Sequence, residues 1–173
     1  MPPPSIGTIV ALVTGLDASI RDQLELVGLI AVAVVLGAII GAEREVSNKS
    51  AGLRTHALVA AGSALAVAIG HILYEAGLDD GAGGDPARAL HAVLTGIGFI
   101  GAGAIIRHHH TSVEGLTTAA SIWFAAGVGI ATGIGLPVVA VGATLVGLLV
   151  LTLMRHVNAI IQRWSGEYSE NVP

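Results

Sequence analysis

The chain has 173 residues, of which 53% are hydrophobic, 12% charged and 3% aromatic, with 24 glycines, no cysteine and a formal net charge of −4. A soluble domain averages about 25% charged residues, so this composition is typical of a single integral membrane domain. The lack of cysteine excludes a disulfide framework, a thiolate nucleophile and a zinc–thiolate site.

The N-terminal stretch MPPPSIGTIV has no basic residue and therefore does not resemble a cleaved signal peptide. Ile6–Leu16 is apolar but too short to cross a bilayer, so we expect an interfacial or loosely ordered segment there. Residues 1–23 are interpreted as an N-terminal outer segment.

Five apolar runs are each close to the ~20 residues that a membrane-spanning helix needs, although the fourth is short and polar at its start. The sequence predicts an all-α, five-helix transmembrane domain over residues 24–154, followed by a cytoplasmic tail over residues 155–173. The expected spans are Leu24–Ala42, Thr55–Leu73, Ala87–Ile106, Thr117–Gly133 and Leu136–Met154.

Basic residues set the expected orientation, because cytoplasmic loops of membrane proteins are enriched in Lys and Arg. With five spans, only Arg21 and Arg88 fall on the other side from the remaining basic residues. The N-terminus should therefore lie outside and the C-terminus in the cytoplasm. The basic residues on the predicted cytoplasmic side are Arg44, Lys49, Arg54, Arg107, Arg155 and Arg163.

Small residues recur at four-residue intervals in four of the spans, a pattern that lets membrane helices touch backbone to backbone. These ridges are Ala33/Gly37/Gly41, Gly62/Ala66/Gly70, Ala125/Gly129/Gly133 and Ala143/Gly147. Glycine is densest in the third span, which we expect to be enclosed by the other helices rather than broken around a ligand. Its glycines are Gly96, Gly98, Gly101 and Gly103.

Three local patterns are compatible with ligand sites but have plainer interpretations. The G-x-G-x-x-G match at residues 96–101 lies inside an apolar run, so we reject a dinucleotide site. For His108–His110 with Glu114 we favour a solvated loop over a metal site. We likewise favour a solvated loop over a cation or pH-sensing site at the outer face, where the candidates are Asp79, Asp80, Asp85, Arg88, His71 and His91. Asp85-Pro86 also suits the start of the third helix.

A more specific charged cluster is expected at the cytoplasmic boundary of the membrane, and we call its members the inner-face candidates. Its members are Glu43, Arg44, Arg54, His56 and Arg107. Charges this close to lipid are usually paired, and Glu43 with Arg54 or Arg107 is the natural pairing. Independent side chains that each reach water are an equally good interpretation.

Several ordered motifs together give the chain a family resemblance. Gly37-x-x-x-Gly41-x-Glu43-Arg44-Glu45, Ala51–His56, Asp85-Pro86-x-Arg88, Gly96–Gly103 and Gly115–Ser121 resemble the blocks of the MgtC/SapB family of bacterial inner-membrane proteins, in the same order. The resemblance runs from about Leu24 to Met154. Pathogen-type members carry a soluble domain after the fifth span, where this chain has Arg155–Pro173.

The resemblance implies an inner-membrane protein linked to adaptation to low magnesium and, in pathogens, to virulence through survival in macrophages. It favours a regulator that binds membrane partners such as ATP synthase, and needs no cofactor, over a magnesium transporter. The middles of the five spans contain no Asp or Glu, which argues against a Mg²⁺ path through one subunit but leaves open a path between subunits. No residues support an enzyme or a nucleic-acid site, and the oligomeric state stays open.

Overall fold

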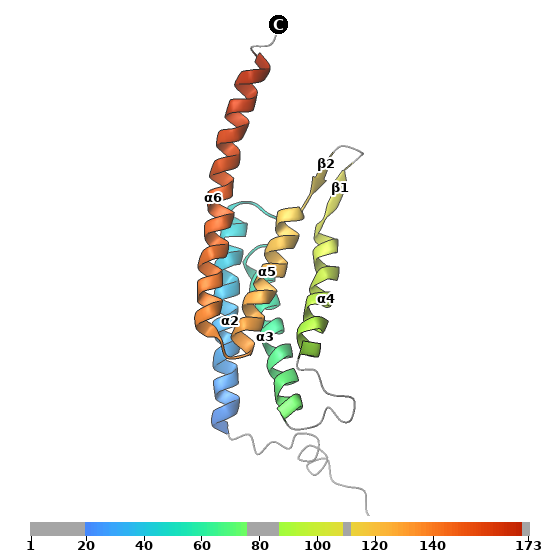
Figure 1. Cartoon of the computed structure of the whole chain (residues 1–173), viewed down its shortest axis with the longest axis vertical. Helices are drawn as coiled ribbons and strands as arrows, with labels where there is room; N and C mark the ends of the chain where they lie inside the picture. The colour runs from blue at the N-terminus through green and yellow to red at the C-terminus, as the bar shows by residue number, and fades with distance from the viewer. Residues whose placement is uncertain (1–19, 76–86, 109–111, 171–173) are drawn as a thin grey trace, which may run out of the picture.

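The computed structural model describes residues 20–75, 87–108 and 112–170, and it places five long helices in one bundle (Figure 1). Each of these helices is long and apolar enough to cross a membrane, so the prediction of an all-α, five-span membrane protein is confirmed. The helices are α2 (Ile20–Val46), α3 (Leu53–Glu75), α4 (Ala87–Ala104), α5 (Leu116–Gly133) and α6 (Pro137–Glu170).

The helices differ from the expected spans mainly at their ends. Helix α2 begins before Leu24, with Asp22 in its first turn and Arg44 in its last, an arrangement that complements the helix dipole. Helix α6 continues past Met154 to Glu170 and extends beyond the other helices at one end of the bundle (Figure 1). The segment Ile6–Leu16 lies outside the described residues.

Helix α5 is the centre of the bundle, because it packs against each of the other four helices. Within its membrane-spanning window 56% of the residues are buried, against 11% for both α4 and α6. Its buried face carries hydroxyl groups as well as apolar side chains, since Thr118, Ser121 and Thr132 are all buried there. Each of these side chains therefore faces protein rather than lipid.

The predicted enclosure of the third span is wrong for the single chain. This span is α4, which packs against α5 along one edge and leaves most of its surface uncovered. A Cβ atom added at Gly96, Gly98 or Gly103 would meet nothing within 4 Å, and one at Gly101 would meet Ala119 Cβ at 3.7 Å. The central position that the glycine density suggested for α4 belongs to α5.

Glycine instead brings α2, α3 and α5 into backbone contact. A Cβ atom at Gly37 of α2 would lie 2.5 Å from the carbonyl oxygen of His56 in α3, and one at Gly41 would lie 2.6 Å from Leu53 Cα. A Cβ atom at Gly129 of α5 would overlap the carbonyl oxygen of Ala60 in α3. On α3, Ala60 and Ala64 are fully buried, and a Cβ atom at Gly133 would likewise overlap the Ala64 backbone. Of the expected ridge on α3, Gly62 has no neighbour within 4 Å of a Cβ position, whereas Gly70 lies close to Ala89 of α4.

A short antiparallel hairpin, which the sequence did not predict, joins α4 to α5. Its strands are β1 (Ile106–His108) and β2 (Ser112–Glu114), so the third helix ends at Ala104 rather than Ile106. Gly115 then starts α5 with φ of 89°, and a Cβ there would overlap the Ala104 carbonyl oxygen. Only glycine fits both the left-handed backbone and this close approach.

Candidate functional site at the loop end of the bundle

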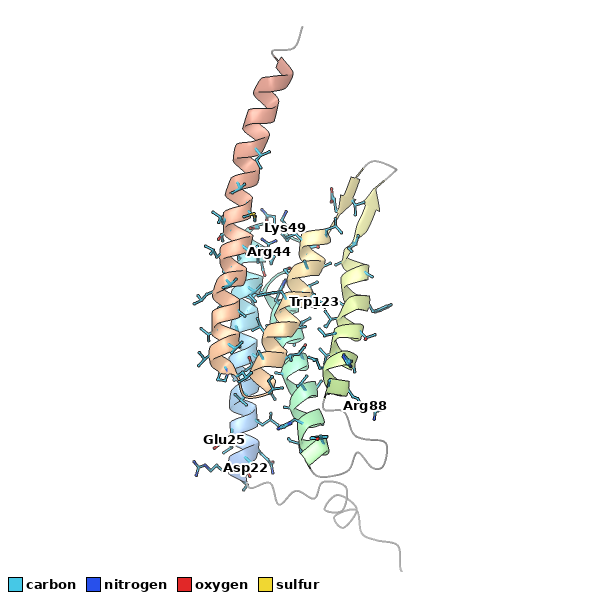
Figure 2. All side chains as sticks on the ribbon, viewed as in Figure 1. Asp22, Glu25, Arg44, Lys49, Arg88 and Trp123 are labelled. Atoms are coloured by element: carbon cyan, nitrogen blue, oxygen red, sulfur yellow. The ribbon has the colours of Figure 1, made fainter. Side chains whose placement is uncertain are left out.

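The described charges gather at the two ends of the bundle. Figure 2 shows Asp22, Glu25 and Arg88 towards one end, with Arg44 and Lys49 at the other. We call the second end the loop end, because residues 47–52 connect α2 to α3 there. Most of the inner-face candidates lie at the loop end.

A carboxylate–guanidinium network joins the end of α2 to α6. Glu43 Oε2 accepts a hydrogen bond from Arg44 Nε at 2.6 Å, and Glu43 Oε1 accepts one from Ser47 Oγ at 2.8 Å. Arg155 Nη1 donates to Ser47 Oγ at 2.9 Å and lies 4.0 Å from Glu43 Oε1. We call these four residues the Glu43 network. The Arg44 side chain is only 3% exposed, so its charge depends on Glu43.

The expected pairing of Glu43 with Arg54 is replaced by the pairs with Arg44 and Arg155. Arg54 is exposed, and it forms no ion pair with any part of the chain that the structure describes. The side chain of Arg107 is not among the described ones. Glu45 has a local role, since its Oε2 accepts a hydrogen bond from the Leu53 amide at 2.9 Å and so caps the start of α3.

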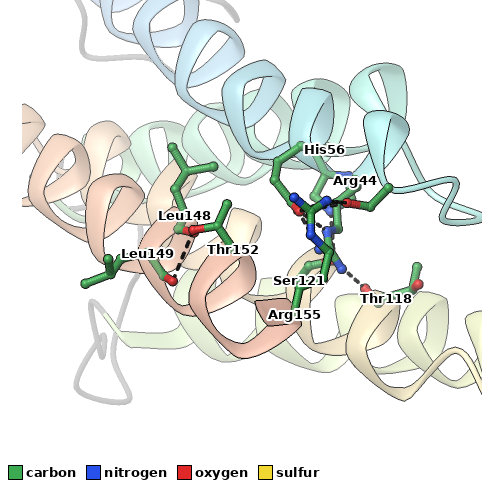
Figure 3. Close-up of polar contacts among 10 residues, drawn as sticks. Arg44, His56, Thr118, Ser121, Leu148, Leu149, Thr152 and Arg155 are labelled. Carbon is green, nitrogen blue, oxygen red and sulfur yellow. Dashed lines mark hydrogen bonds and ion pairs between the residues drawn. The ribbon is translucent and has the colours of Figure 1, made fainter. Parts of the chain in front are cut away.

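His56 links α3 to the central helix. Its side chain is fully buried, with Nδ1 2.9 Å from the Gly52 carbonyl oxygen and Nε2 3.0 Å from Ser121 Oγ (Figure 3). A carbonyl oxygen only accepts, so Nδ1 carries a hydrogen; in the neutral ring Nε2 then accepts from the Ser121 hydroxyl. Ser121 Oγ also lies 2.8 Å from the Thr118 carbonyl oxygen, to which it can donate instead. Because the hydroxyl has one hydrogen, Ser121 donates either to the neutral ring or to the Thr118 carbonyl oxygen, whereas the Nδ1 bond to Gly52 is kept in both arrangements.

This arrangement holds helices together and offers little for catalysis. The pair formed by His56 and Ser121 has the residue types of a nucleophile and its base, but the two are 0% and 4% exposed, and Nδ1 bonds to a backbone carbonyl rather than to a carboxylate. A substrate would have no access to the hydroxyl. Together with the Glu43 network, the pair ties α2, α3, α5 and α6 at the loop end.

Sequence reasoning missed Ser47, Ser121 and Arg155 as members of the site. Ser47 stands four residues after Glu43, a spacing that places both side chains on one helix face and was available as a signal. Ser121 ends the Gly115–Ser121 block, which was noted only for its family resemblance. No sequence pattern indicated that Arg155 would contact Ser47, which lies more than a hundred positions earlier in the chain.

Three of the six outer-face candidates are among the described residues. His71 near the end of α3 and His91 in α4 are exposed, and Arg88 lies in the first turn of α4. Asp79, Asp80 and Asp85 lie outside the described residues, as do His109 and His110. Within the part of the chain that is described, no group of three or more metal-ligating side chains occurs.

Comparison with known proteins places the chain in a family. The model of the MgtC family matches residues 30–160. An uncharacterized protein of Haemophilus influenzae is 38% identical over 83% of this chain and 59% of its own length. The putative magnesium transporter YhiD of Escherichia coli K12 is 41% identical over 76% and 60% of the two chains, and the protein MgtC of Salmonella typhimurium is 40% identical over 72% and 50%.

The chain thus spans between half and about 60% of the length of these relatives. No solved structure matches it. The matched residues include nearly all of the five spans and the whole Glu43 network. On the strength of the family model and of the relatives' identity, the chain belongs to the MgtC family.

Proposed function

We propose that this protein is a non-enzymatic regulator in the bacterial inner membrane, linked to adaptation to low magnesium, which acts by binding a helix of another membrane protein. The observation that carries the proposal is a groove of about 560 Å³ between α3 and α4. Gly62 and Gly96 line it, and neither has a neighbour within 4 Å of the position where a Cβ would stand.

The chemistry of the groove suits a transmembrane helix. Its other lining residues are apolar apart from Ser63, and Phe99 at its edge is 83% exposed. Small residues let a second backbone approach closely, while a large exposed ring supplies contact area. Within the family, a proton-pore subunit of ATP synthase is the first candidate partner.

Transport of Mg²⁺ is the alternative, and the name of the YhiD relative points to it. The buried hydroxyls within the spans argue against a path through one chain, because Thr132 and Thr144 each donate to a carbonyl of their own helix. Mg²⁺ sheds water reluctantly and binds mainly through carboxylates. A polar, water-lined wall is therefore needed for its passage, and these spans supply mainly small and aliphatic side chains.

Crosslinking in native membranes tests the docking groove. Because the chain has no cysteine, Gly62→Cys and Phe99→Cys can each carry a maleimide photocrosslinker. We expect both to capture the same integral membrane protein. The control is Val138→Cys, since Val138 is 84% exposed but lies on α6, away from the groove.

A flux measurement separates the regulator from the transporter. The purified protein in liposomes should pass no more Mg²⁺ than protein-free liposomes, with a concentration gradient and a membrane potential applied. Saturable Mg²⁺ flux combined with no groove-specific crosslink would overturn the regulator and establish transport, through one chain or between copies.

The proposed orientation places the loop end in the cytoplasm. Lys49→Cys, in the α2–α3 loop, should resist an impermeant thiol reagent added to intact cells, whereas Gly135→Cys, between α5 and α6, should react. Both should react once the membrane is permeabilised. The opposite pattern in intact cells would invert the orientation argued from Lys and Arg.

A further inference from the structure

A second cavity, distinct from the groove between α3 and α4, opens at the loop end. It measures about 690 Å³ and lies between the 46–49 segment, the first turn of α5 and the 150–155 segment of α6. Its lining combines three cationic side chains, from Arg44, Lys49 and Arg155, with an apolar wall.

The cations in this cavity are not fully neutralised by the protein. Glu43 is the carboxylate that contacts Arg44 and Arg155, and Arg44 is committed to it. Lys49 is exposed, and its side chain has no hydrogen bond or ion pair within the described part of the chain. The Arg155 side chain is 53% exposed. Two cationic groups thus remain available to a ligand.

The backbone adds to this positive character. Helix α5 begins at Leu116 beside the cavity, which Thr117 lines, and it has no side-chain cap at Gly115 and no acidic residue in its first turn. The N-terminal end of a helix carries a partial positive charge, which favours an anion. The ligand that fits these groups is a phosphate.

The apolar wall distinguishes a phospholipid from a free phosphate. Val150, Leu151 and Met154 line the cavity on α6, and all three lie near the end of the membrane-spanning segment Pro137–Arg155. A soluble anion would make no favourable contact with these apolar side chains, whereas an acyl chain would pack along them. Basic pockets between membrane helices are a recurrent way of holding anionic headgroups.

We propose that the loop-end cavity binds an anionic phospholipid, with its phosphate between Lys49, Arg155 and the start of α5 and an acyl chain along α6. The inference does not depend on the docking groove or on the proposed partner. It gives the Glu43 network a further role, because Glu43 and Ser47 hold the Arg155 side chain at the cavity.

Native mass spectrometry of the full chain tests the proposal, after exchange into mixed micelles containing phosphatidylglycerol or phosphatidylcholine. We expect retention of one phosphatidylglycerol in preference to phosphatidylcholine. Lys49→Gln and Arg155→Gln should each weaken that retention about fivefold, the change expected for one basic residue near an anionic lipid. Arg54→Gln is the matched control, since Arg54 is an exposed cation that does not line the cavity.

Three outcomes would overturn the assignment. Equal retention of the two lipids would remove the headgroup selectivity. An equal loss in Arg54→Gln would show an effect of overall surface charge. Displacement of the lipid by millimolar glycerol phosphate would indicate a site for a soluble anion, whereas resistance to it supports the acyl contact along α6. Because Lys49 has no side-chain partner in the described chain, its variant should remain folded and keep the test decisive.

Discussion

Gly129→Ala should remove most of the folded protein, whereas Gly98→Ala should leave its amount unchanged or raise it. At Gly129 the new methyl group would overlap the Ala60 carbonyl oxygen and lie 2.8 Å from its carbon, so the α3 and α5 backbones would have to separate. Forcing an extra methyl group into a packed core typically costs about 1–3 kcal/mol, and more where backbone must move. At Gly98 there is nothing within 4 Å, and alanine gains about 0.5–1 kcal/mol of helix stability over glycine.

The measurement is the fraction of detergent-extracted protein that elutes as a monodisperse peak, together with its thermal midpoint. Gly133→Ala should behave as Gly129→Ala does, because it meets the Ala64 backbone in the same helix pair. Gly96→Ala should behave as Gly98→Ala does. If the α4 variants lose as much folded protein as the α5 variants, then α4 is enclosed in the assembled protein by another copy or a partner.

The membrane spans could be predicted because they depend only on the length and hydrophobicity of continuous segments of the sequence. A run of about twenty apolar residues has to be helical in lipid, where every backbone group must bond within its own segment. The order of helices around the centre depends on side-chain contacts, and glycine density alone does not set it. Glycine shows how closely a neighbour can approach, but it does not show that a neighbour is present.

A better signal for the centre was the polarity of the fourth span. Polar side chains in membrane helices usually face the interior of the bundle. Thr118, Ser121 and Thr132 all lie on the buried face of α5, and each has a hydrogen-bond acceptor or is packed in protein. The polar residues at the start of this span made it a weaker candidate for a membrane helix, yet they indicate that the helix lies in the interior of the bundle.

The charged site was predicted in position but not in pairing. Residues at i and i+1 of a helix point in different directions, so Glu43 and Arg44 did not suggest a pair. The long Arg44 side chain nevertheless reaches the Glu43 carboxylate. The contact with Arg155 exists because α6 packs against α2. Residue spacing along the chain does not show which helices pack together.

Glu43→Leu should destabilise the protein strongly, and adding Arg44→Leu should restore much of the loss. The single change leaves the Arg44 guanidinium, which is 3% exposed, without its anion. Removing one partner of a buried pair costs about 3–5 kcal/mol, while replacing both by apolar residues is often close to neutral. The free energy of unfolding in mixed SDS micelles, measured for the wild type, both single variants and the double variant, gives the coupling directly.

Two controls separate this pair from charge effects in general. Arg21→Leu breaks the ion pair with Glu25 on the same helix, but these side chains are 85% and 67% exposed, so stability should change little. Arg54→Glu combined with Glu43→Arg should show no mutual rescue, because Arg54 is exposed and makes no ion pair with the described residues. Additive losses in the Glu43→Leu/Arg44→Leu cycle would mean that each side chain reaches water independently. Rescue in the Arg54→Glu/Glu43→Arg double variant would instead show that Glu43 pairs with Arg54 rather than with Arg44.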